Sequence, residues 1–288
     1  MSEKLEYYFL AFLLWLSRWL PKSWIYGMMN GIAMLLYRLI KRRREITVQN
    51  LRLAFPQKSE EEIRQLSKTV YSELSQTVAE ILLILTDRFD VDDAVINREE
   101  ILERLAEFRK EHQEGWILMT AHFSNWELLG QFLSKNGYEM LILGREADNK
   151  LIDEKIIVRL REKYGSRAIN KRRSSVAVLK RLKRAGIVGV LIDQKVGKEL
   201  GIRVKFFGRD VYMTGMVASM QEKVNATVVP MFFAREARGR YRIILRDPVQ
   251  FNGNREEMTQ KYSDIMEEVI RKYPSQWFWM HDRWKKES

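Results

Sequence analysis

The sequence predicts an α/β fold, with a mixed, mostly parallel sheet flanked by helices and with hydrophobic helices at the N-terminus. Short apolar runs alternate with longer segments whose apolar residues recur at helical spacing, which is the pattern of a layered α/β sheet. With 288 residues, of which 46% are hydrophobic and 31% charged, the chain can bury a full core in one large domain. We find no repeat, low-complexity tract or Pro/Ser-rich linker. We therefore expect a membrane-associating helical segment at residues 1–56 and one domain at residues 57–288.

Two apolar runs, from Tyr7 to Leu16 and from Trp24 to Tyr37, precede a basic cluster at Lys41–Arg44. Each run is shorter than the roughly 18 apolar residues of a confident membrane span. The start lacks the basic region and the cleavage site of a secretory signal, so we do not expect one. Tryptophans beside the runs and the basic cluster favour helices embedded in one leaflet, with the cations at the headgroups. A single tilted span and plain core helices are alternatives that the pattern leaves open.

Beyond Pro56 the expected elements follow one another in order. Two charge-rich segments with helical spacing, Ser59–Thr86 and Arg98–Glu111, come first. The expected strands are Trp116–Ala121, Met140–Gly144, Ile187–Ile192, Thr227–Phe233 and Tyr241–Arg246. The expected helices between and after them are Trp126–Lys135, Asn149–Tyr164, Ser175–Ala185, Thr214–Val224 and Arg255–Lys272.

The run Ala121-His122-Phe123-Ser124-Asn125-Trp126-Glu127 joins the first of these strands to the helix after it. Two residues five apart on one regular helix point about 140° away from each other and cannot touch. With His122 in the turn and Glu127 in the first helical turn, the imidazole and the carboxylate can meet. Such a pair is a general base with its orienting acid, suited to deprotonating a hydroxyl that attacks an activated acyl group.

A structural role explains the same residues. Ser124-x-x-Glu127 is also the pattern of a capping box, in which Glu127 only fixes the start of the helix. The chain holds three histidines, His112, His122 and His281, and their scatter along the sequence does not point to a catalytic cluster. Spacing alone therefore leaves the catalytic and the capping interpretations open.

The composition of the chain excludes several kinds of catalytic and metal-binding site. The chain has no cysteine, which excludes a thiol nucleophile, a disulfide framework and a thiolate metal site. With scattered histidines as well, we expect no metal and no cofactor. The net charge of +12 points to an anionic partner. We find no zinc-finger spacing, RNA-binding aromatic segment or Gly-rich clamp, so we expect an anionic membrane surface and not nucleic acid.

Six ordered blocks of the chain are similar to segments of one known family. The blocks are Arg43–Pro56, His122–Glu127, Val190–Gly197, Val204–Gly208, Val228–Pro230 and Gln276–Lys285. On these blocks the chain resembles the late acyltransferases of lipid A synthesis, the lauroyl- and myristoyltransferase family related to the glycerophospholipid acyltransferases. The resemblance implies a glycerolipid-acyltransferase-like α/β fold.

The resemblance also implies a reaction. It is the transfer of a fatty acyl chain from a thioester of acyl carrier protein or coenzyme A to a hydroxyl of a lipid A precursor or a similar membrane glycolipid. His122 would be the general base and Glu127 its partner, on the cytoplasmic face of the cytoplasmic membrane. The alternatives are a lysophospholipid acyltransferase, which usually has Asp where Glu127 stands, and a non-catalytic membrane lipid-binding protein of the same fold.

Four further residues are candidates for substrate binding. Arg161 falls near the family's basic position, where it would bind an acceptor phosphate or the developing oxyanion, unless it belongs to a solvated helix face. Asp193 ends an apolar strand run, where a carboxylate usually has a polar partner, or it caps the next segment. Arg145, after the second strand, and Arg283, near the C-terminus, are expected to contact phosphates. Asp282 departs from the basic residue that the family often shows at that position.

Overall fold

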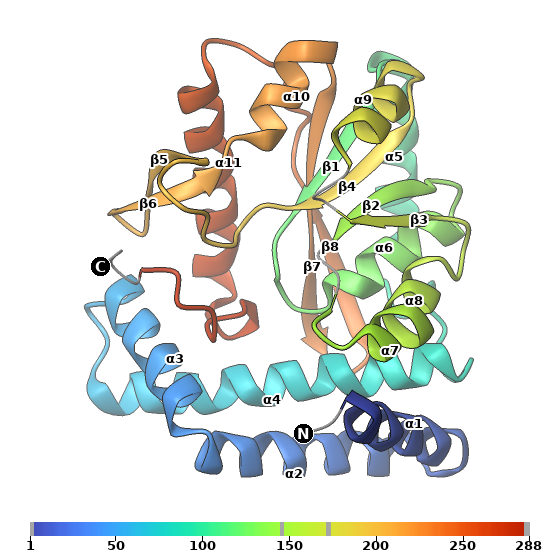
Figure 1. Ribbon diagram of the computed structural model, residues 1–288, viewed down its shortest axis with the longest axis vertical. Helices are drawn as coiled ribbons and strands as arrows, with labels where there is room; N and C mark the ends of the chain where they lie inside the picture. Colours follow the sequence, from blue (N-terminus) through green and yellow to red (C-terminus); the bar gives the residue numbers. More distant parts are fainter. Residues whose placement is uncertain (1–2, 145–146, 171–173, 285–288) are drawn as a thin grey trace.

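A computed structural model describes residues 3–144, 147–170 and 174–284, and a six-stranded sheet forms the centre of this part of the chain (Figure 1). Its strands are β1 (Trp116–Thr120), β2 (Met140–Gly144), β3 (Arg167–Asn170), β4 (Ile187–Leu191), β7 (Thr227–Ala237) and β8 (Arg240–Leu245). They lie in the order β3-β2-β4-β1-β7-β8. All neighbouring pairs are parallel except β7 and β8, which are antiparallel. The expected mixed, mostly parallel sheet is confirmed.

Helices surround the sheet, and a long helix, α4, crosses one end of it (Figure 1). The helices before the sheet are α1 (Glu3–Trp19), α2 (Lys22–Leu39), α3 (Lys41–Ala54), α4 (Glu60–Leu85) and α5 (Arg98–Glu111). Those among and after the strands are α6 (Trp126–Lys135), α7 (Lys150–Ile152), α8 (Arg159–Arg161), α9 (Ser175–Lys183), α10 (Met216–Val224) and α11 (Arg255–Lys272). The domain division expected between residues 56 and 57 falls in the connection between α3 and α4.

The side chains of β1 divide the core into two clusters. Ile117 and Met119 belong to the cluster that α9, α10 and α11 cover, whereas Trp116 and Leu118 belong to the cluster that α5 and α6 cover. Successive side chains of a strand point to opposite faces, so a strand covered on both faces is apolar throughout. This double burial is why the sequence predicted these strands from short continuous apolar runs.

The structure contains three strands that the sequence analysis did not predict. The edge strand β3 is only partly buried and lacks a continuous apolar run. The others, β5 (Gly201–Phe206) and β6 (Arg209–Thr214), form a separate antiparallel hairpin. The helix expected at Asn149–Tyr164 is shorter and consists of α7, a π-helical turn at Asp153–Val158 and α8.

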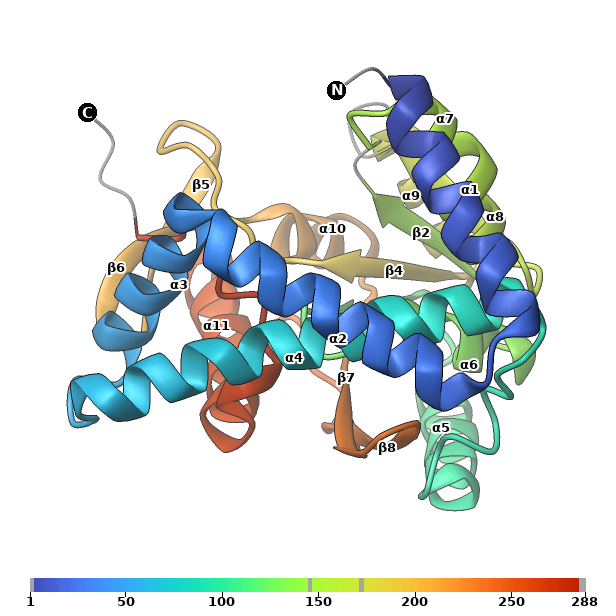
Figure 2. The same cartoon turned by 90° about the horizontal axis from the view of Figure 1, so that it is seen from below.

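Helix α2 lies along the outer side of α4, and α1 crosses α4 near its C-terminal end (Figure 2). Leu13, Ile25 and Met29 bury themselves there against Leu82 and Leu83 of α4. The first two helices also present large exposed apolar side chains, namely Leu5, Tyr8, Phe9, Phe12, Trp15, Trp19, Trp24, Leu35, Leu36 and Leu39. Within the described ranges we find no helix that combines the length and the apolar character needed to cross a bilayer.

Candidate active site

Two parallel strands end side by side and bring His122 and Asp193 together. Thr120 of β1 pairs with Leu191 of β4, and each of the two polar residues lies two positions further along its chain. The imidazole Nδ1 of His122 lies 2.8 Å from Oδ1 of Asp193, and the backbone N–H of His122 donates to Oδ2 at 3.0 Å. This meeting point lies at the carboxyl ends of parallel strands, where ligands bind in open α/β sheets.

Asp193 is a buried carboxylate with several donors around it. Its side chain is 3% exposed, and the indole N–H of Trp277 donates to Oδ2 at 2.8 Å. Burial by itself raises the pKa of Asp193, but the charge of His122 and these hydrogen bonds hold that pKa well below its usual range. Asp193 is therefore ionised and keeps a proton on Nδ1 of the imidazole.

The imidazole of His122 is oriented so that Nε2 is its basic atom. Burial acts to lower the pKa of His122, but the charge and hydrogen bond of Asp193 outweigh it, so the pKa lies above its ordinary value. Because Nδ1–H donates to Asp193, the neutral ring carries its lone pair on Nε2. That atom lies 3.2 Å from the side-chain nitrogen of Gln194, which is exposed. A ligand with a polar O–H or N–H group can take the place of the Gln194 amide.

The structure corrects the expected contact between His122 and Glu127. In the described part of the chain Glu127 accepts hydrogen bonds from Arg161 and from the indole N–H of Trp126, and Asp193 is the carboxylate that holds the ring. The physical reason is direction: Nδ1 faces the end of the neighbouring strand β4, whereas Glu127 faces α8. The orienting acid of the imidazole therefore comes from another strand.

The capping-box interpretation is wrong as well. Helix α6 begins at Trp126, and its cap is Asn125, whose Oδ1 accepts the Leu128 N–H at 3.1 Å. The buried Oγ of Ser124 makes no hydrogen bond among the described residues. Ser124 has a φ of 51°, so it belongs to the turn before the cap. Glu127 is thus engaged with α8 and not with the helix start.

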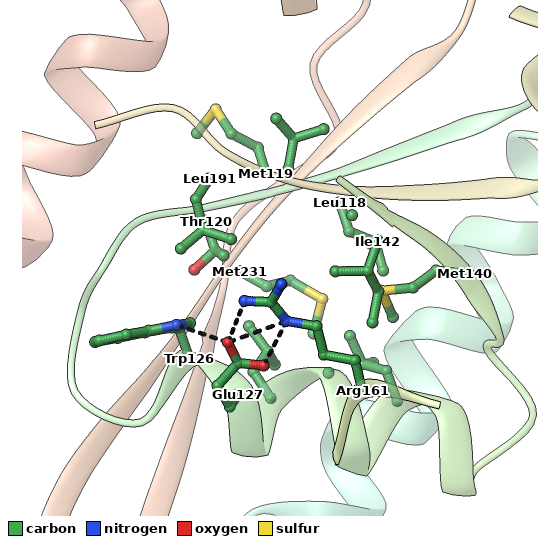
Figure 3. A pocket seen from close by; sticks show the side chains of 15 residues that line it. Leu118, Met119, Thr120, Trp126, Glu127, Met140, Ile142, Arg161, Leu191 and Met231 are labelled. Atoms are coloured by element: carbon green, nitrogen blue, oxygen red, sulfur yellow. Dashed lines mark hydrogen bonds and ion pairs between the residues drawn. The ribbon is translucent and has the colours of Figure 1, made fainter. Parts of the chain in front are cut away.

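Arg161 of α8 forms a two-pronged ion pair with Glu127 (Figure 3). Its Nη2 lies 2.6 Å from Oε1 and its Nε 3.1 Å from Oε2, and the two side chains are only 17% and 13% exposed. Burial lowers the pKa of Arg161, but the charge of Glu127 more than compensates and raises it. Gly144, at the end of β2, makes room, because a Cβ there would overlap Nη1. The solvated-face interpretation of Arg161 is therefore wrong.

The ion pair borders an apolar pocket between the sheet and α6 (Figure 3). The apolar side chains that line it are Leu118, Met119, Leu129, Leu133, Met140, Ile142, Val190, Leu191 and Met231. Trp126 separates the pocket from His122, since its ring lines the pocket and lies 5.1 Å from the imidazole, centroid to centroid. The ion pair is the charged part of the pocket lining, so the polar end of a ligand with an apolar chain would lie beside Arg161 and Glu127.

A buried ionic network supports the turn from one side. The Asn125 side-chain N–H donates to Oε2 of Glu80 at 2.9 Å, and Glu80 in turn pairs with Arg235 at 3.1 Å. Arg235 also pairs with Glu73, and both glutamates belong to α4. A buried charge without a partner is costly, so this network ties α4, β7 and the start of α6 together.

The C-terminal segment holds the turn from the other side. The N–H of Ser124 donates to the carbonyl oxygen of Gln276 at 2.6 Å, and the N–H of Phe278 donates to that of His122 at 3.0 Å. Phe123 and Trp277 face each other in an antiparallel bridge. The C-terminal block of the sequence is therefore part of the site, although it is more than 150 residues away from His122 in the chain.

Four of the expected site residues, His122, Glu127, Arg161 and Asp193, lie around this site. Arg283 lies in the interior with 1% of its surface exposed, and its Nη1 donates to the carbonyl oxygen of Tyr212 at 2.8 Å. Burial lowers the pKa of Arg283 to about 10. Its expected phosphate contact stays a prediction, and Arg145 lies outside the described residues.

Sequence reasoning missed the roles of Gln194 and Trp277 at the imidazole. Both residues occur in the quoted blocks, but nothing in their local pattern distinguishes them from residues that only pack. One sequence pattern pointed to the two strand ends that form the site: an apolar run followed by a polar residue occurs at both His122 and Asp193. Only the strand order shows that the two ends are neighbours.

The sequence matches known proteins over nearly its whole length. A family model described as bacterial lipid A biosynthesis acyltransferase matches residues 2–286. The lipid A biosynthesis lauroyltransferase of Escherichia coli (strain K12) is 26% identical over 284 residues, which covers 94% of this chain and 89% of that protein. The lipid A biosynthesis acyltransferase of Haemophilus influenzae (strain ATCC 51907 / DSM 11121 / KW20 / Rd) is 20% identical over 249 residues, which covers 83% of this chain and 75% of that protein.

Proposed function

Since the chain belongs to the bacterial lipid A biosynthesis acyltransferase family and is an acyltransferase, we propose that it moves a fatty acyl chain from a thioester to a hydroxyl of a lipid A precursor or similar membrane glycolipid. The donor is acyl carrier protein or coenzyme A. One observation carries the proposal: Asp193 fixes Nδ1 of His122, so Nε2 is basic and faces an exposed side chain that a hydroxyl can displace. A histidine held by a carboxylate in this way is a general base.

In the proposed reaction Nε2 of His122 takes the hydroxyl proton while the hydroxyl oxygen attacks the thioester carbonyl carbon. A C–O bond forms and the carbonyl oxygen becomes an oxyanion. As this intermediate collapses, the C–S bond breaks and the imidazolium returns its proton to the leaving thiolate. Asp193 stabilises the imidazolium between the two proton transfers. The step needs no covalent acyl-enzyme.

Arg161 and the apolar pocket complete the proposed site. Glu127 occupies Nε and Nη2 of Arg161, which leaves Nη1 on the side of Gly144. We assign to this cation the stabilisation of the oxyanion or of a substrate phosphate, supported by its electrostatic effect on His122. The donor's acyl chain enters the pocket beside the ion pair. The pocket has a volume of only about 40 Å³, so Met140 and Met231, which are flexible, must move to admit the chain.

The proposed place of action is the cytoplasmic face of the cytoplasmic membrane. Phe12, Trp15 and Trp19 of α1 are each more than half exposed, and the chain carries a net charge of +12. A group of exposed aromatic and aliphatic side chains beside basic residues is typical of a helix that lies in a membrane interface. These features support binding to an anionic membrane surface, where the glycolipid acceptor resides.

The test is an acyl-transfer assay with defined donors and acceptors. The purified chain receives acyl carrier protein or coenzyme A thioesters of one chain length, together with a lipid A precursor or a lysophospholipid. Mass spectrometry should show one added acyl chain on the glycolipid with the wild-type protein and none with His122→Ala. Acylation of the lysophospholipid alone would favour the lysophospholipid acyltransferase alternative. Binding of the glycolipid without acylation would favour the non-catalytic lipid-binding alternative.

A further inference from the structure

We propose that a second apolar groove, between α1, α2 and α4, holds a fatty acyl chain of the acceptor lipid, and that Arg43 at the groove binds the acceptor's phosphate. This inference rests on the proposed transfer to an acylated sugar phosphate and adds the place where that acceptor is held. The groove has a volume of about 310 Å³ and is separate from the pocket beside Glu127 and Arg161. Its size is within the range of ligand-binding pockets in proteins.

The groove suits a single extended hydrocarbon chain. Its lining from α1 and α2 consists of Phe9, Leu10, Leu13, Met29, Ile32, Ala33 and Leu36. Helix α4 contributes Tyr71, Leu74, Ser75, Val78 and Leu82, each of which lies three or four positions from another of the set, so that they share one helix face. From Tyr71 to Leu82 this face is about 16 Å long at 1.5 Å per residue, which is comparable to an extended fatty acyl chain.

One side of the groove is open and the other is closed. Phe9, Leu36 and Val78 are exposed at its mouth, whereas Leu13 and Leu82 are buried at its floor. The mouth thus lies among the exposed apolar side chains of α1 and α2. If these helices lie in the membrane interface, a lipid chain can enter the groove without crossing water.

The groove adjoins a small cavity that His122 lines. Leu74 lines the groove and also lines the small cavity beside His122, so one side chain separates the two spaces. Met280 lines the groove, and Phe278, two residues before it, hydrogen-bonds to the His122 carbonyl oxygen. An acceptor with one chain in the groove can therefore place its polar sugar on the side of the cavity beside His122.

Arg43 supplies charge complementarity for a phosphate. It is exposed, lines the groove, and donates to the carbonyl oxygen of Met280 at 3.2 Å. Its neighbour Lys41 pairs with Glu45, whereas no carboxylate in the described part of the chain pairs with Arg43. Asn50 ties α3 to the same C-terminal segment, because its side-chain N–H groups donate to the carbonyl oxygens of Trp279 and His281. An arginine fixed in this way is suited to a phosphate oxygen.

The first experiment locates the acceptor chain without requiring turnover. The probe is an acylated sugar phosphate with a photoactivatable diazirine at the end of one acyl chain, in mixed micelles with the full-length protein. Labelled peptides are mapped by mass spectrometry for wild type, Ala33→Trp and Leu35→Trp. Ala33 lines the groove, whereas Leu35 is exposed on another face of the same helix. Label on α2 and α4 should fall at least tenfold in Ala33→Trp and stay unchanged in Leu35→Trp.

Equal labelling of α2 and α4 in both variants, or label confined to the pocket beside Arg161, would overturn the proposal. Val78→Trp blocks the exposed mouth and gives a second variant if Ala33→Trp does not fold. A phosphatidylglycerol carrying the same diazirine that labels the groove as strongly would make it a general lipid groove and also overturn the assignment. Label in the groove without any acyl transfer by the wild-type protein would contradict the proposed function alone.

The second experiment tests Arg43 by steady-state kinetics. Arg43→Ala should raise the KM for the phosphorylated acceptor roughly tenfold or more, because it removes one charge-assisted contact. The value of kcat should change little. Arg42→Ala removes the same charge from an exposed residue that does not line the groove and should leave that KM within about twofold. With the same glycolipid lacking its phosphate, Arg43→Ala and wild type should have equal KM values. Equal effects of the two variants would reduce Arg43 to a general membrane contact.

Discussion

At the scale of single residues, the site depends on a carboxylate that approaches the imidazole from a different strand. Asp193 accepts hydrogen bonds from the ring, from the backbone of His122 and from Trp277, so its position and its charge are both fixed. Glu127, which the sequence suggested for this role, fixes Arg161 instead. The site thus contains a histidine–carboxylate pair, to which we assign proton transfer, and a separate ion pair between Glu127 and Arg161.

Asp193→Asn should move the acid limb of the pH profile of kcat/KM to lower pH. In the proposed reaction neutral His122 is the active form, so the rate should rise with pH through a pKa that the aspartate holds above its ordinary value of about 6.5. Without the negative charge, burial dominates and lowers that pKa. The maximum rate should also fall roughly 10²–10⁴-fold, because asparagine can stabilise the wrong tautomer. His112→Gln, a change outside the site, is the control and should leave the acid limb of the profile where it is. If the acid limb of Asp193→Asn also stayed in place, a group other than His122 would be responsible for it.

Glu127→Gln should lower turnover about 10- to 100-fold, the loss expected from weakening a charge-assisted pair that positions Arg161. The acid limb of the pH profile should move to lower pH, but less than in Asp193→Asn, since the charge of Glu127 also raises the pKa of His122 whereas only Asp193 is bonded to the ring. Arg161→Lys keeps the charge but loses the planar two-pronged geometry, so it should also lose activity. The double variant Glu127→Gln/Arg161→Ala should be little worse than Arg161→Ala, and additive losses would show that the two residues act independently.

At the scale of the elements, the start of α6 is defined by Asn125 although Ser124 fits the capping pattern equally well. The positive φ of Ser124 places it in the turn, and its hydroxyl lies buried without a partner in the described part of the chain. Asn125 caps α6 and also reaches Glu80 in α4. One residue therefore fixes both the helix start and its attachment to the long helix below the sheet.

Asn125→Ala should destabilise the protein by roughly 2 kcal/mol or more, because it removes a helix cap and one donor to a buried carboxylate. Ser124→Ala is the matched control and should change the free energy of unfolding by less than about 0.5 kcal/mol, since its hydroxyl makes no hydrogen bond with any of the described residues. Urea unfolding of the two variants and the wild type measures the difference. Equal losses would show that the hydroxyl of Ser124 takes part in the cap.

At the scale of the whole molecule, α1 and α2 have two different faces. Their inner faces complete a core cluster with Ala79, Leu82 and Leu83 of α4, and their outer faces carry the exposed aromatic residues. Deleting the residues before Arg42 would therefore expose this cluster as well as remove the proposed membrane contact. Substitutions on the outer face separate the two effects.

Phe12→Glu and Trp15→Glu should each weaken binding to anionic vesicles at least tenfold, because each removes apolar area from the interface and adds a repelled charge. Both residues are more than half exposed, so the melting temperature should change little. Val176→Glu, which makes the same kind of change at an exposed position on α9, should bind vesicles nearly as well as wild type. Unchanged binding of the α1 variants at low and high salt would place the membrane contact elsewhere.

The sequence by itself determined the layered α/β fold and most of its elements. Strands covered on both faces are continuous apolar runs, and β2, α6 and α11 were predicted with the bounds that the structure has. The strands β3, β5 and β6 were missed, because these half-exposed strands lack such runs. His122 was identified because a polar turn follows an apolar strand, which is a local signal.

The tertiary structure alone decided which residues meet at the site. His122 and Asp193 are 71 positions apart in the chain. They come together because β1 and β4 are neighbours in the sheet and end at the same level, with Thr120 paired to Leu191. Sequence spacing favoured Glu127, five residues away, but a side chain's direction depends on how its helix packs, and α6 turns Glu127 toward Arg161 of α8. Strands and turns can be predicted from local patterns because interactions within the segment form them. Which charged residues pair depends on the order of the strands in the sheet, and that order cannot be read from any one segment.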